Sequence, residues 1–194
     1  MKMNTKTIVG MGLLTAIVIV LQALAINIRF GVFAITLVLV PIIVGAALYG
    51  WQAGAWLGFV FGVVVLFTDA GAFLAVNIPG TIITVLVKGT VAGLAAGAVY
   101  AALAKKTNQM IATVVAGIVA PVVNTGIFVL GCFLFFMDTI STWAEGAGFE
   151  NATVFIFTGM IGVNFVVELV INLVLSTVIV QIVNIGKREI LKAA

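Results

Sequence analysis

Two residues of opposite charge stand inside long apolar stretches of the sequence, Lys88 and Glu168. A charged side chain at the centre of a bilayer costs about 2.5–3.5 kcal/mol on insertion scales, so such a residue usually faces a cavity or a partner. The pair therefore predicts two compatible arrangements. The side chains form a buried ion pair, or they line a water-accessible binding cavity.

Each charge belongs to a stripe of polar residues at helical spacing. Three segments contribute polar faces: Asn77, Thr81, Thr84 and Lys88; Asn164, Glu168, Asn172 and Ser176; and Asn124 with Thr125, shortly after Pro121. At 100° per residue the first stripe falls within about 60° of one helix face. We expect the three faces to converge on one cavity, although for any single asparagine or threonine a hydrogen bond between helices is the simpler interpretation.

The amino-acid composition indicates that these residues lie in a membrane protein. Of 194 residues, 64% are hydrophobic and 8% are charged, whereas soluble domains are about half apolar and about a quarter charged. A soluble enzyme, a nucleic-acid-binding protein and a disordered chain are excluded. The apolar runs do not alternate with polar residues as in an outer-membrane barrel. The sequence predicts an all-α integral membrane protein.

Long apolar runs predict six membrane-spanning helices in a single membrane domain, residues 1–194. The spans cover about residues 7–25, 33–49, 51–67, 79–103, 110–136 and 154–183. A span takes about 20 residues, so little chain is left for connections. Only residues 68–78 and 137–153 are long enough to form lids.

The basic residues predict the orientation. Seven of them lie at the termini or between the fourth and fifth spans: Lys2, Lys6, Lys105, Lys106, Lys187, Arg188 and Lys192. Positive charges favour the cytoplasmic side, so both termini are expected in the cytoplasm, with the helices in the cell membrane. The basic start and Ala23-Leu24-Ala25 resemble a signal peptide. Because the apolar run exceeds the usual length of about 7–15 residues, we expect it to be retained as a span.

Several absences argue against catalysis. The chain has no histidine, and Cys132 is its single cysteine, so His-ligated metals and thiolate clusters are excluded. Neither serine, Ser141 or Ser176, lies in a nucleophile motif. No phosphate-binding loop is present, so another subunit would have to hydrolyse any ATP that is used. We expect neither an enzyme nor a bound cofactor or metal.

The outer connections contain further candidate ligand contacts. Arg29, beside Asn27 and Phe30, could clamp an anionic solute or anchor the chain at the membrane interface. Trp143 could cover a ligand as part of a lid, or rest among the lipid headgroups.

Small residues at a spacing of four suggest close helix approach. Gly89, Gly93 and Gly97 on the fourth span predict internal packing. Gly12 and Ala16 on the first span could pack internally too, or could form an exposed surface that docks another membrane subunit.

Three segments, residues 27–31, 120–126 and 162–165, resemble the substrate-binding S components of energy-coupling factor (ECF) vitamin transporters, in particular the pantothenate-type branch. The resemblance implies ATP-driven import of a vitamin or precursor, captured near the outer face by the first loop and the last three spans. It also implies that small residues of the first span dock onto a membrane coupling (T) subunit, which works with two ATPase subunits. Gly12 and Ala16 occupy that place here, with glycine for the usual first alanine.

Pantothenate has a carboxylate, two hydroxyls and an amide. Arg29 or Lys88 would suit the carboxylate, with the asparagines matching the rest and Glu168 serving as the partner of Lys88. A hydroxymethylpyrimidine, a pyridoxine-like compound or folate stays open as the ligand. The main alternative function is an ion-coupled secondary transporter that uses Lys88 and Glu168, although no inverted repeat is apparent. An intramembrane enzyme is the third possibility.

Overall fold

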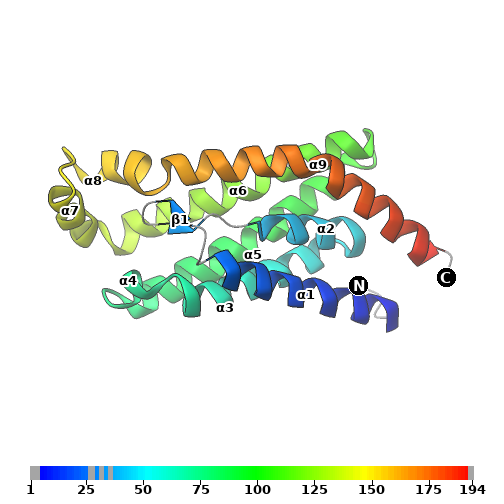
Figure 1. Ribbon diagram of the computed structural model, residues 1–194, viewed down its shortest axis with the longest axis horizontal. Helices are drawn as coiled ribbons and strands as arrows, with labels where there is room; N and C mark the ends of the chain where they lie inside the picture. The colour runs from blue at the N-terminus through cyan, green and yellow to red at the C-terminus, as the bar shows by residue number, and fades with distance from the viewer. Residues whose placement is uncertain (1–4, 26–28, 31–32, 35–36, 192–194) are drawn as a thin grey trace.

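The computed structural model describes residues 5–25, 29–30, 33–34 and 37–191. Its elements are α1 (Thr5–Ala25), β1 (Arg29–Phe30), β2 (Phe33–Ala34), α2 (Leu39–Tyr49), α3 (Trp51–Thr68), α4 (Gly71–Leu74), α5 (Ile78–Leu103), α6 (Gln109–Phe135), α7 (Met137–Gly146), α8 (Ala152–Val154), the π-helical turn η1 (Phe155–Met160) and α9 (Gly162–Leu191). The long helices lie side by side as a bundle (Figure 1). The helical fold class is confirmed, with β1 and β2 forming one small antiparallel hairpin.

Five helices of the described chain are long and apolar enough to cross a membrane: α1, α3, α5, α6 and the continuous segment Ala152–Arg188. The second predicted span differs from the expectation, because α2 begins at Leu39 rather than at residue 33. Pro41 therefore lies in the first turn of α2, where a missing backbone donor is tolerated. The 11 residues of α2 rise only about 17 Å, less than the roughly 30 Å of a bilayer core.

The long helices run alternately up and down the bundle (Figure 1). The start of α1, the connection between α5 and α6, and the end of α9 lie at one end, which we call the termini end. The short helices α4 and α7 lie at the opposite end, which we call the far end. The lid expectation for residues 68–78 and 137–153 thus falls on α4 and α7, which are short helices rather than irregular loops.

Glycines bring the backbones of α3 and α5 into contact. A Cβ added at Gly58 would collide with the carbonyl oxygen of Gly89, and one at Gly89 with that of Gly58. Gly54 and Gly93 make a second reciprocal pair of the same kind. Because only glycine permits this approach, the predicted packing role of Gly89, Gly93 and Gly97 is confirmed.

The contact between α6 and α9 is looser. Pro121 lies inside α6, and a Cβ at Gly117 would find its nearest neighbour, the Ser176 Oγ, at 3.6 Å. On α9 the Asn172 Nδ2 donates to the backbone oxygen of Glu168 at 2.9 Å, and the Ser176 Oγ donates to that of Asn172 at 2.8 Å. The second half of the predicted α9 stripe therefore supports helix packing.

The first helix is attached by a narrow stripe. Its buried residues are Met11, Val18, Gln22 and Ala25, and the Trp56 Nε1 of α3 donates to the Thr15 Oγ1 at 3.2 Å. Gly12 and Ala16 are exposed, and no atom lies within 4 Å of a Cβ built at Gly12. Internal packing among the described residues therefore does not account for this small-residue face.

Candidate functional site

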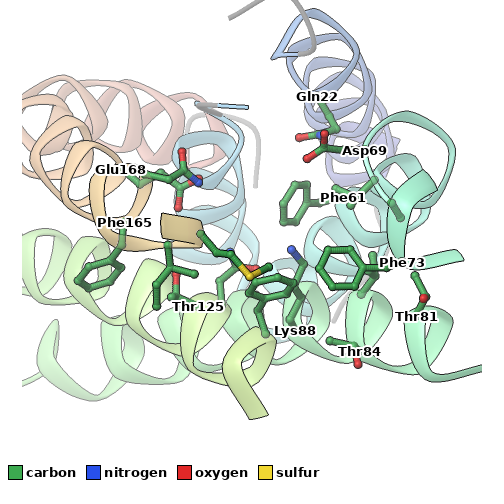
Figure 2. A pocket seen from close by; sticks show the side chains of 18 of the residues that line it. Gln22, Phe61, Asp69, Phe73, Thr81, Thr84, Lys88, Thr125, Phe165 and Glu168 are labelled. Atoms are coloured by element: carbon green, nitrogen blue, oxygen red, sulfur yellow. The ribbon is translucent and has the colours of Figure 1, made fainter. Parts of the chain in front are cut away.

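A cavity of about 90 Å³ opens between α1, α3, α5, α6 and α9. Figure 2 shows side chains that line it. They come from the end of α1, the end of α3, the start of α5, the second half of α6 and the start of α9, so the cavity lies in the far half of the bundle (Figure 1). Six predicted ligand contacts line it: Thr81, Thr84, Lys88, Asn124, Asn164 and Glu168. The expected convergence of three polar helix faces is what the structure shows.

Lys88 extends into the cavity from the α5 backbone that packs on α3. Its Nζ lies 5.1 Å from the ring centroid of Phe128 and 5.9 Å from that of Phe61. A cation over aromatic faces is stabilised by about 0.5–2 kcal/mol, so the two rings hold the ammonium in place without neutralising its charge.

Glu168 enters the same cavity from α9 and is 4% exposed. In the described part of the chain its carboxylate has neither a hydrogen-bond donor nor an ion-pair partner within 4.0 Å, so the direct pair with Lys88 that the sequence predicted is not formed. The two charges come from different helices, α5 and α9, and α6 packs against both of them. The spacing of the polar residues predicted which face of each helix lines the cavity, but it did not predict the distance between those faces.

Four buried side-chain oxygens that line the cavity lack a hydrogen-bond partner among the described residues. They are the Gln22 Oε1, Thr84 Oγ1, Asn124 Oδ1 and Asn164 Oδ1. Most buried polar atoms in proteins are hydrogen-bonded, and leaving one unpaired costs about 1–3 kcal/mol. Their gathering at one cavity makes it the candidate site for a polar solute, which could supply the missing partners.

Aromatic rings close the far end of the cavity. Phe73 of α4 makes edge-on contacts with Phe136 at 5.0 Å, Trp143 at 5.5 Å and Phe128 at 5.7 Å between ring centroids. Trp143 of α7 was predicted to cover a ligand. It supports this cluster through Phe73 rather than lining the cavity itself.

Of the remaining predicted site residues, the structure describes the side chain of Asn77, which does not line the cavity. Asn77 caps α5, since its Oδ1 accepts the Gly80 N–H at 2.9 Å, which explains an asparagine two residues before Pro79. Arg29 and Phe30 form β1, but their side chains lie outside the described structure, as does all of Asn27. Gly12 and Ala16 face outward from α1, away from the cavity.

Sequence reasoning missed several lining residues: Gln22, Asp69, Phe61, Phe73, Phe128, Phe136 and Phe165. Gln22 could have been predicted as a lining residue, because a polar amide inside the apolar first span is costly in a membrane and usually faces a cavity or a partner. The phenylalanines could not, since 14 are spread through the chain and only the fold selects those that meet.

The side chains that line this cavity are of the kinds that bind polar solutes. Among the described residues no three His, Cys, Asp or Glu side chains gather as a metal site. The cavity instead offers one ammonium, carboxylates, amides and hydroxyls within an aromatic enclosure, the pattern of small-molecule pockets.

A sequence model of the family described as "ECF transporter, substrate-specific component" matches residues 6–180. No curated protein and no solved structure matches the chain. The match covers most of the chain, including every helix that lines the cavity.

Proposed function

Because the chain belongs to the family of ECF transporter substrate-specific components, we propose that its cavity captures a vitamin or vitamin precursor, with pantothenate as the best candidate. Components of this family work with a T subunit and ATPase subunits. The chain is a multi-pass membrane protein, and its part in import is to bind the substrate.

The observation that carries the proposal is that, among the described residues, unpaired buried oxygens gather around the Lys88 ammonium. Lys88 suits a carboxylate, because charge-assisted hydrogen bonds are about twice as strong as neutral ones. The side chains of Asn124, Asn164 and Thr84 suit the hydroxyls and the amide.

The size of the cavity adds a condition. Its volume of about 90 Å³ is well below the roughly 300–1,000 Å³ of typical ligand pockets. A vitamin-sized solute therefore binds only if the walls of the cavity separate.

The decisive experiment is mass spectrometry of the solute that co-purifies with the full chain, followed by saturable binding of labelled pantothenate to protein in lipid nanodiscs. We expect tight binding without an ion gradient or ATP. If no vitamin in a broad panel binds saturably, the proposal is wrong.

We also propose that Gly12 and Ala16 dock the T subunit, since both are exposed on α1. Ala16→Trp and Gly12→Trp should leave solute binding intact and abolish uptake by the assembled transporter. Gly10→Trp is the matched control, because a Cβ at Gly10 already collides with the Tyr49 side chain. That variant should lose stability instead. Normal uptake by Ala16→Trp would exclude this docking face.

The proposed orientation places the far end outside a bacterial cell and the termini end in the cytoplasm. The acids Asp138, Glu145 and Glu150 lie in or beside α7 at the far end, whereas Lys105 and Lys106 follow α5. In a Cys132→Ala background, an impermeant thiol reagent added to whole cells should label Glu150→Cys and spare Lys106→Cys. The reverse pattern would invert the topology.

Family membership favours ATP-driven import over the ion-coupled alternative built on Lys88 and Glu168. The two differ in energy source. Uptake that stops on ATP depletion but continues with a protonophore supports the S-component function, and the opposite result would support the carrier.

A further inference from the structure

The unpaired groups of the cavity share one chemical character, because they are oxygen atoms that can accept hydrogen bonds. The cavity contains the carboxylate of Glu168 and the amide oxygens of Gln22, Asn124 and Asn164, which we call the acceptor set. We propose that this set selects solutes carrying at least two hydrogen-bond donors, hydroxyl or amide N–H, and orients them with any anionic group toward Lys88. This inference rests on the proposed function of the cavity as the substrate site.

The hydrogen bonds around Gln22 fix its amide as an acceptor toward the cavity. The Thr68 hydroxyl donates its single proton to the backbone oxygen of Val64 at 2.9 Å. Its oxygen can therefore only accept, and it accepts from the Gln22 Nε2 at 3.4 Å. Among the described residues the Oε1 has no partner, and the side chain is 3% exposed. The glutamine can therefore accept a hydrogen bond from a donor on a solute in the cavity.

Glu168 needs donors for a simpler reason. When ionised, its carboxylate only accepts hydrogen bonds, and no described side chain donates to it, although it is 4% exposed. The Asn172 amide, one turn further along α9, is committed to the backbone oxygen of Glu168. Asn124 adds a third buried acceptor at 7% exposure.

The acceptors and the cation reach the cavity from different helices. The acceptor set comes from α1, α6 and α9, while Lys88 comes from α5 and rests over two aromatic rings (Figure 2). A solute carboxylate beside Glu168 would meet a like charge, and beside Lys88 an opposite one. A solute without donors would leave the acceptor set buried and unpaired, and sites built on such groups strongly reject analogues that lack the matching group.

Three probes test this selection on the full chain in nanodiscs. Pantothenate has both the carboxylate and the donors. Panthenol replaces the carboxylate with a hydroxymethyl group, and N-propionyl-β-alanine keeps the carboxylate and amide but lacks both pantoyl hydroxyls. We expect panthenol to bind about tenfold more weakly than pantothenate and the hydroxyl-free acid about 100-fold more weakly, as two lost hydrogen bonds imply. Equal binding of the hydroxyl-free acid and pantothenate would overturn the proposal.

Variants locate the effect. Gln22→Met and Asn164→Ala should each weaken pantothenate binding about tenfold and reduce the penalty for the missing hydroxyls. Asn172→Ala is the matched control on α9, since its side chain bonds its own helix outside the cavity, and it should change affinity by less than about twofold. Weaker binding with an unchanged hydroxyl penalty would indicate a structural role only and would contradict the proposal.

The proposal about the acceptor set can be tested even if pantothenate is not the substrate. If none of the three probes binds, pantothenate is the wrong substrate, and the solute that co-purifies with the chain then decides. A solute with two or more donors, lost from Gln22→Met and Asn164→Ala but retained by Asn172→Ala, supports the acceptor set. A co-purified solute with fewer than two donors overturns it.

Discussion

The two sides of the cavity are built in contrasting ways. On the α3–α5 wall, reciprocal glycine pairs place backbone against backbone. Lys88 is the residue just before Gly89, one of these glycines. On the α6–α9 wall, α6 contains Pro121, α9 is preceded by the π-helical turn η1, and the packing glycine Gly117 leaves ordinary van der Waals space.

This difference indicates which side moves. Backbones in contact leave no room for the α3–α5 wall to shift, whereas proline and π-helical turns mark places where helices bend and where functional sites are common. We therefore expect α6 and α9 to move outward when the cavity binds a solute. The α3–α5 wall, which we call the fixed wall, positions the Lys88 ammonium. The α6–α9 wall, which we call the adaptable wall, adjusts the positions of the Asn124 and Asn164 amides.

The largest expected effect breaks the fixed wall. In Gly58→Ala the new Cβ meets the carbonyl oxygen of Gly89, and because this neighbour is backbone it cannot rotate away. Overpacking of this kind destabilises by about 3 kcal/mol, which thermal unfolding in detergent will measure. Gly126→Ala, at a helical position with nothing within 4 Å, is the control and should not destabilise. Equal stability of the two variants would contradict the rigid contact.

The next effect removes the charge that the fixed wall presents. Lys88→Met keeps a long side chain over the rings of Phe61 and Phe128 but lacks the ammonium. Binding of an acidic solute should fall about 10–100-fold, the loss of one charged hydrogen bond, while a neutral analogue should lose little. Calorimetry on both solutes checks this. Lys187→Met is the control, because that ammonium bonds the Tyr100 Oη at 3.1 Å, away from the cavity.

A smaller effect concerns the adaptable wall. Pro121→Ala gives α6 a backbone donor that the proline lacks, so the helix should become straighter and slightly more stable. Asn124 lies three residues further along and would be displaced from its place at the cavity. We expect binding to weaken by about three- to tenfold while the unfolding temperature holds or rises. A parallel loss of stability and binding would mean that the proline serves packing alone.

The smallest expected effect on stability is that of a glycine substitution in the adaptable wall, compared with Gly58→Ala in the fixed wall. Gly117→Ala places a Cβ 3.6 Å from the Ser176 Oγ, an ordinary contact distance, and alanine favours helix over glycine by about 1 kcal/mol. Its stability should stay within about 1 kcal/mol of the parent protein, in contrast to Gly58→Ala. A large loss at Gly117 would remove the distinction between the walls.

The polar residues of the site were predictable where their spacing repeats along a helix. Thr81, Thr84 and Lys88 share a face, and so do Asn164 and Glu168, and all five line the cavity. Each stripe has residues at one end that do not line the cavity: Asn77 in the first, and Asn172 and Ser176 in the second. Asn77 became an N-cap, because a side chain just outside a helix bonds its free N–H groups.

Other features depend on distances that no single segment encodes. The separation of Lys88 from Glu168 is set by how α6 packs between α5 and α9. The start of α2 was placed too early because residues 33–38 are as apolar as a helix interior, and apolar content alone does not distinguish a strand from a helix. The expectation for Arg29 as a ligand contact stays a prediction.

The glycine contact between α3 and α5 also bears on how the protein is made. Only nine residues, 69–77, separate the two helices, so their association closes a short loop, and such local contacts form early. During synthesis α5 enters the membrane before α6 and α9 exist, and its partner α3 is already there. The wall that carries Lys88 can therefore assemble first and serve as the template on which the later helices are placed.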